Sequence, residues 1–79
     1  MAGPPPPGPP VKRSVTIAGH ETSIALEPIF WSALETAASE RRLPLNALIA
    51  RIDAERLEQS PAANLASAIR QWLFARPGG

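Results

Sequence analysis

Cysteine is absent from this sequence of 79 residues, and histidine occurs once. These absences exclude disulfides, thiolate zinc sites, cysteine nucleophiles and metal sites that need several histidines. A nucleophile, a base and an orienting group cannot be assembled from the remaining residues. The acidic residues of the second half, such as Asp53, lie at helical spacing from Arg51 and Arg56, which predicts surface ion pairs. We therefore expect no enzymatic activity, no cofactor and no metal.

Charge of one sign and long apolar runs are also missing. Eight Lys and Arg residues stand against seven Asp and Glu residues, for a net charge of +1. A net charge this small does not attract the whole protein to nucleic acid or membrane. Any site for a polyanion therefore has to come from basic residues that lie close together. No apolar run approaches the roughly 20 residues of a membrane span. The N-terminus has no apolar segment of a secretory signal. We expect a cytoplasmic protein with no membrane contact.

Proline is concentrated at the N-terminus. Residues 1–10 hold six of the ten prolines and no Val, Ile, Leu or aromatic residue. This segment is typical of a disordered, polyproline-II-prone tail, so residues 11–79 form the folded domain. A domain of this size buries only about 60% of its unfolded surface, and without disulfides or metal it needs a partner chain. We therefore expect a homo-oligomer.

The segment from Val11 to Leu26 predicts a β-hairpin. Apolar and polar residues alternate around Val15 and Ile17, and again around Ile24 and Leu26. Gly19 can adopt positive φ, which predicts a two-residue type II′ turn at Gly19-His20. The predicted register pairs Ile17 with Thr22, Val15 with Ile24, and Arg13 with Leu26. Its apolar face then holds Val15, Ile17, Ile24 and Leu26, and its other face holds Lys12, Ser14, Thr16, Ser23 and Ala25.

Three helices are predicted after the hairpin. The first begins at Pro28, which suits the first helical position, and runs to about Arg41. Pro44 interrupts the pattern, and the second helix runs from Leu45 to Leu57 or Glu58. Asn64 is a suitable N-cap for a third helix from Leu65 to about Ala75. The fold class is therefore α+β, with an N-terminal β-hairpin followed by three α-helices.

This arrangement resembles the ribbon-helix-helix fold. More narrowly, residues 12–20 together with Thr22-Ser23, Phe30-Trp31, residues 45–48 and residues 64–70 resemble a family of short bacterial ribbon-helix-helix proteins with an added N-terminal strand. The resemblance implies a homodimer with an intermolecular antiparallel ribbon, and an extra helix at the C-terminus. The implied dimer core consists of Ile24, Leu26, Trp31, Leu34, Leu48, Ile49 and Ile52.

The resemblance also implies a DNA-binding protein, with transcriptional regulation as its role. Members of the wider fold place the paired ribbon in the major groove, and the start of the second helix meets phosphate. For each side chain involved, the alternative is an ordinary solvated surface residue. Carried over to this chain, the DNA-binding residues are Lys12, Arg13, Ser14, Thr16, Ser23, Arg41, Arg42 and Asn46.

Several positions depart from this pattern. Glu21 and Ala25 lie on the outward strand face, where DNA-reading relatives carry side chains that form bidentate base contacts. Pro44 stands where a Ser or Thr would cap the second helix. These departures favour a second hypothesis, a protein-interaction module on the same dimer scaffold, acting as an adaptor or in an antitoxin-like role. Its protein partner would contact Trp72, Leu73 and Phe74, which otherwise enlarge the dimer core.

Overall fold

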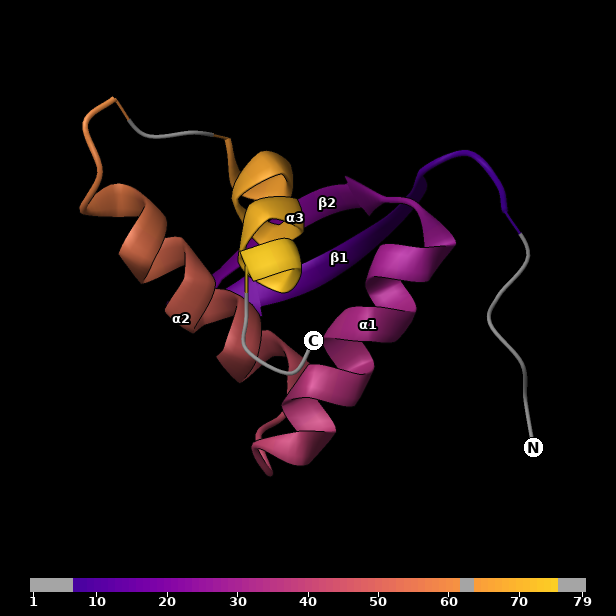
Figure 1. Cartoon of the computed structure of the whole chain (residues 1–79). Coiled ribbons are helices and arrows are strands. Elements are labelled where there is room, and N and C mark those ends of the chain that lie inside the picture. Colours follow the sequence, from indigo (N-terminus) through magenta and orange to yellow (C-terminus); the bar gives the residue numbers. More distant parts are fainter. Residues whose placement is uncertain (1–6, 62–63, 76–79) are drawn as a thin grey trace.

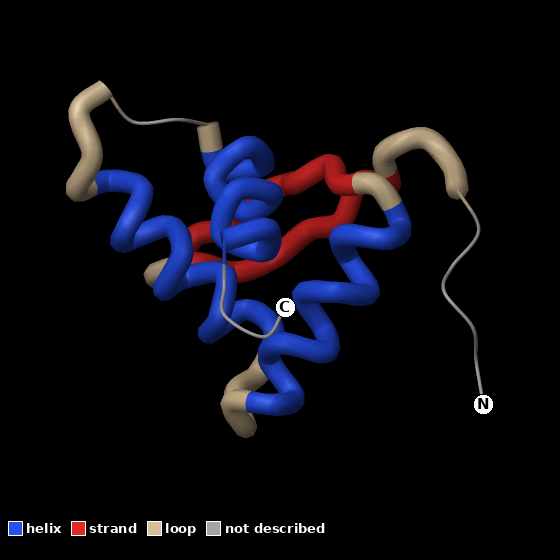
Figure 2. The backbone as a smooth tube through the Cα atoms, in the orientation of Figure 1, coloured by secondary structure: helices blue, strands red, loops and turns tan. Residues whose placement is uncertain are grey.

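The computed structural model describes residues 7–61 and 64–75. A β-hairpin forms one layer, and three helices cover one of its faces (Figures 1 and 2). The predicted order of elements is confirmed. Residues 7–10 are exposed and lie outside the helices and strands, whereas residues 1–6 of the predicted tail fall outside the described residues. The elements are β1 (Val11–Ile17), β2 (His20–Leu26), α1 (Pro28–Glu40), α2 (Leu45–Leu57) and α3 (Leu65–Ala75).

The hairpin register differs from the prediction by two residues. Ile17 pairs with His20 and Val15 with Thr22, so the turn is Ala18-Gly19 and not Gly19-His20. Ala18 has φ 51° and Gly19 has φ 82°. Positive φ at both central residues is the signature of a type I′ turn, whose twist matches that of the flanking strands. The predicted type II′ turn is therefore wrong.

The assignment of residues to the two faces of the hairpin is nevertheless confirmed. Val15, Ile17, Ile24 and Leu26 are buried, and their polar neighbours along each strand are exposed. A strand has a side-chain period of two, so a slip of two residues leaves every side chain on its original face. The pattern of faces therefore cannot distinguish the two registers, and the turn geometry decides between them.

Sequence features mark the starts of α1 and α3, and backbone geometry shows how α1 ends. Pro28 occupies the first turn of α1, and Asn64 caps α3 by accepting a hydrogen bond from the Ser67 N–H at 2.8 Å. α1 ends as Arg42 turns into the left-handed region at φ 56°. The Arg42 N–H then donates to the Ser39 carbonyl, and the Leu43 N–H donates to the Ala38 carbonyl. This pair of bonds satisfies carbonyls that the last turn leaves open.

The hydrophobic core is closed by α3. Ile69 is fully buried, and Leu73 is 8% exposed, against the same core that α1, α2 and the inner hairpin face supply. Burying a side chain of this size contributes roughly 1.5–3 kcal/mol, so these two residues dominate the docking of α3. The seven residues expected in a dimer core are each at most 4% exposed within one chain. These side chains therefore do not need a partner chain for their burial, because α3 covers them together with α1, α2 and the hairpin.

Polar and aromatic contacts from the middle of α3 fix its orientation. The Arg70 guanidinium donates to the Glu27 carboxylate at 2.8 and 3.0 Å, and it lies 5.7 Å from the centre of the Phe30 ring. Two residues further along α3, the Trp72 ring has the Arg41 guanidinium 4.9 Å from its centre. Both contacts join α3 to α1 or its flanks. They orient a helix that apolar burial holds in place.

The turn geometry leads to a stability prediction. Ala18 pays a steric cost at φ 51°, whereas asparagine tolerates positive φ and Asn-Gly is the preferred type I′ pair. We expect Ala18→Asn to raise the free energy of unfolding by about 1 kcal/mol. Urea unfolding at a fixed protein concentration measures the change. Under the register first predicted, residue 18 is an ordinary strand position and the same substitution would destabilise the protein.

The Glu27 carboxylate makes stability depend on pH. A backbone hydrogen bond at Glu27 itself lowers the pKa of this carboxyl below its usual 4.5, and the bond from Arg70 lowers it further. A lowered folded-state pKa stabilises the protein above the usual value, and this stabilisation is lost as the pH falls through the folded-state pKa. We expect Glu27→Gln to flatten the dependence of unfolding free energy on pH between about pH 6 and pH 3. Arg70→Gln should flatten it less, and wild-type slopes in both variants would contradict the assignment.

Candidate nucleic-acid interface

The hairpin face turned away from the helices is exposed. In the observed register, its side chains lie in three cross-strand pairs. Ser14 opposite Ser23 occupies the centre, with short hydroxyl groups on both strands. All six side chains are exposed, and the helices leave this face uncovered (Figure 2). The pairs are Lys12 with Ala25, Ser14 with Ser23, and Thr16 with Glu21.

This outward face has little charge. Lys12 is on β1 and Glu21 on β2, so the face is neutral overall. Its other members are two serines, a threonine and an alanine. None of them has the forked donor or acceptor groups that read a base pair bidentately. The face can therefore offer single hydrogen bonds and one cation, but not the contacts that usually give strong base discrimination.

Arg13 does not join the outward face. It pairs with Ile24 on the inner side, and its guanidinium Nη1 donates to the Glu35 Oε2 at 3.1 Å. The same guanidinium lies 4.7 Å from the centre of the Trp31 ring. The alternation along β1 already places Arg13 on the same face as Val15 and Ile17. The predicted DNA-binding set, which includes both Lys12 and Arg13, did not take this alternation into account.

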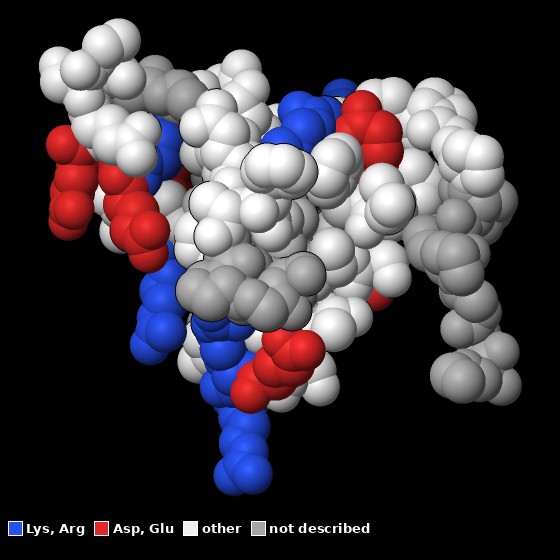
Figure 3. Space-filling model, viewed as in Figure 1, with Lys and Arg blue, Asp and Glu red and all other residues white. Residues whose placement is uncertain are grey.

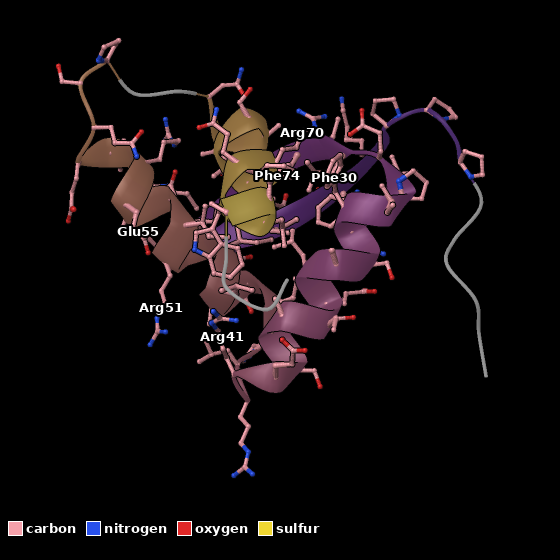
Figure 4. All side chains as sticks on the ribbon, in the orientation of Figure 1. Phe30, Arg41, Arg51, Glu55, Arg70 and Phe74 are labelled. Carbon is pink, nitrogen blue, oxygen red and sulfur yellow. The ribbon has the colours of Figure 1, made fainter. Side chains whose placement is uncertain are left out.

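Arg41, Arg42 and Asn46 form a second group, at the turn between α1 and α2. All three are exposed. This turn lies at the end of α1 remote from the hairpin, so the structure separates it from Lys12, Ser14, Thr16 and Ser23 (Figure 1). Basic side chains extend from this lower end of the helix-covered side, with an acidic side chain beside them (Figure 3). Arg41 itself lies near the end of α3, where it covers Trp72 (Figure 4).

The start of α2 has no side-chain cap. Pro44 is the N-cap residue and makes no side-chain hydrogen bond, as the sequence predicted. Its carbonyl accepts from the Ala47 N–H at 3.0 Å and the Leu48 N–H at 3.2 Å. Arg42 and the first-turn amides of α2 are therefore the groups that this turn can offer to an anion.

β2 has a free edge within the described part of the chain, because the sheet contains only β1 and β2. Ile17 and His20 close a two-residue turn and so form a hydrogen-bonded pair, and such pairs alternate along the ladder. The backbone N–H and C=O groups of Glu21, Ser23 and Ala25 consequently face away from β1. Unpaired groups of this kind are a template for another strand.

The three C-terminal aromatic and apolar residues differ in exposure. Leu73 is buried, Trp72 is partly buried beneath Arg41, and Phe74 is 94% exposed. Phe74 follows Arg70 by one helical turn, and Arg70 lies over the Phe30 ring of α1. Of the predicted contact residues for a protein partner, Phe74 is therefore the one that a partner could reach without displacing α3.

The acidic residues of α2 behave as the spacing predicted. The Asp53 carboxylate accepts from Arg56 at 2.8 and 2.9 Å, an ion pair within one helix.

A groove of about 240 Å³ separates this part of α2 from α3. Its lining residues are Ile52, Glu55, Arg56, Gln59, Ala68, Gln71, Trp72 and Ala75.

A strand that leads directly into two helices, with its polar face uncovered, defines the ribbon-helix-helix class of small domains. A family model described as "Ribbon-helix-helix domain" matches residues 10–76. The chain therefore belongs to the ribbon-helix-helix domain family, and the match includes both β1 and α3. Comparisons with curated proteins and with solved structures found no match. None of the helices in the described ranges has the length and apolar character to cross a bilayer.

Proposed function

We propose that this protein is a homodimeric DNA-binding protein that acts as a transcriptional regulator in the cytoplasm. Ribbon-helix-helix domains are typically non-enzymatic DNA-binding modules, and members of the family generally dimerise. The observation that carries the proposal is the uncovered polar hairpin face beside a free β2 edge. β-ribbons and β-sheets with an exposed polar face are established DNA-binding elements.

The dimer forms through the free edge of β2. Antiparallel pairing of two β2 strands satisfies the outward backbone groups of Glu21, Ser23 and Ala25 in both chains. It also places the polar faces of the two hairpins side by side. The core of each chain is already closed by α3, so the dimer gains chiefly from the hydrogen bonds of the new ladder.

The outward hairpin face then meets the DNA. Lys12 supplies the cation of this face, and Ser14, Thr16 and Ser23 supply hydroxyl groups. Arg41, Arg42 and Asn46 lie at the α1–α2 turn on the helix-covered side, remote from this face, so they are left out of this contact. Arg13 is left out of this set, because Glu35 and Trp31 hold it on the opposite face.

A second candidate function is a protein-interaction module on the same scaffold. The 94% exposure of Phe74 favours it, because a nearly free aromatic ring on a helix is typical of a docking residue. The neutral outward face favours it as well. A stable dimer that fails to bind DNA at low salt would select this second function.

Binding to duplex DNA over a range of salt concentrations tests the first function. Each phosphate contact contributes a slope of about −0.9 in log affinity against log salt, so Lys12→Ala should reduce the slope of a dimer by about 1.8. Arg13→Ala removes the same charge from the inner face. It should leave DNA affinity within about twofold and instead lower the unfolding free energy by about 1 kcal/mol. Equal loss of DNA affinity in both variants would show that the wrong face is assigned.

The dimer is tested by a matched pair of proline substitutions. The N–H groups of Ser14 and Ser23 both face away from the partner strand in the hairpin, where an edge strand tolerates proline. Ser23→Pro removes a donor from the β2 edge and should give a folded monomer in sedimentation experiments. Ser14→Pro changes the outer edge of β1 and should leave a dimer. Retention of the dimer in Ser23→Pro would exclude pairing through β2.

A further inference from the structure

The width of the sheet limits how it can meet DNA. This inference rests on the proposed dimer, in which two β2 strands pair and each β1 lies outside its own β2. Neighbouring strands are about 4.8 Å apart, so the two β1 strands of a dimer are about 14 Å apart. The major groove is about 12 Å wide and admits a two-stranded ribbon. A four-stranded sheet of this width has its outer strands over the phosphate ridges and not inside the groove.

The charges on the outward face match this placement. Lys12 is on β1, the outer strand, and Glu21 is on β2, the inner strand. Both side chains are exposed on the same face. In the dimer, the cations therefore lie above the two phosphate ridges, and the carboxylates lie above the middle of the groove, farther from the phosphates. The opposite arrangement would set acidic groups against the ridges.

The side chains on the inner strand are too short to read bases from this height. Besides Glu21, the members of β2 on the outward face are Ser23, at the centre, and Ala25. The floor of the major groove lies about 8.5 Å below its rim, beyond the reach of a serine or alanine on a strand held above the rim. Hydrogen bonds from this face are consequently limited to the backbone of the DNA.

We propose that the four-stranded sheet lies across the major groove, with both β1 strands on the phosphate ridges. Lys12, Ser14 and Thr16 contact phosphodiester groups there, and the sheet binds duplex DNA with little sequence preference. β1 is therefore the strand that sets affinity. β2 joins the two chains and holds the β1 strands at the spacing of the groove.

A matched pair of lysine substitutions tests this assignment. Ser14 and Ser23 are cross-strand neighbours on the same exposed face, one on the outer strand and one on the inner strand. The full chain and its Ser14→Lys and Ser23→Lys variants are titrated with fluorescent mixed-sequence duplexes of about 20 base pairs at several salt concentrations. Arg51→Gln, on the exposed side of α2, serves as a charge control remote from the hairpin (Figure 4).

Ser14→Lys should steepen the salt slope by about 1.8 per dimer and tighten binding to every duplex alike. Ser23→Lys should steepen it by less than half as much. The wild-type protein should bind unrelated duplexes with affinities within about tenfold, whereas base-reading proteins discriminate by at least about a thousandfold. A larger effect for Ser23→Lys, or a strong sequence preference that Ser23→Ala abolishes, would overturn the inference and leave the DNA-binding function intact. Absence of binding to all duplexes at low salt would overturn both.

Discussion

The docking of α3 on the hairpin core is the interaction on which the rest of the structure depends. The apolar side of a two-stranded sheet is wide, and α1 and α2 alone leave part of it uncovered. Ile69 and Leu73 fill that part, while contacts of Arg70 with Glu27 and of Arg41 with Trp72 orient the helix. Because one chain closes its own core, the second copy is not needed to hide apolar residues. The β2 edge and the outer face of the hairpin thereby remain uncovered in the described part of the chain.

The alternation of side chains along two short strands divides the hairpin into a face packed against the helices and a face exposed to solvent. Side chains at odd positions of β1 and even positions of β2 lie on the helix side, and the others face away. Arg13 and Lys12 are neighbours in sequence, yet they belong to different faces. Arg13 stacks on Trp31 and pairs with Glu35, which makes it part of the scaffold. Adjacent charges in a strand should therefore be assigned to roles by face, not by proximity.

Much of the fold was predictable because local chemistry specifies it. Pro28 and Asn64 mark helix starts, Pro44 separates α1 from α2, and the period-two pattern identifies the hairpin and its faces. The register was not predictable from that pattern, because a shift of two residues preserves it. Contacts between residues far apart in the chain were also not predictable from the sequence. Arg70 and Glu27 are 43 positions apart, and Arg41 meets Trp72 only after α3 has docked.

Arg42 shows how the turn between α1 and α2 combines shape with charge. Its φ of 56° lies in the region where glycine is unstrained and where an ordinary side chain costs roughly 1 kcal/mol. Glycine is the common solution at this point of a helix terminus. The chain instead keeps a long guanidinium at the bend, directly before the amides that open α2. A permanent positive charge therefore lies at a position where the backbone geometry favours glycine, which has no side chain.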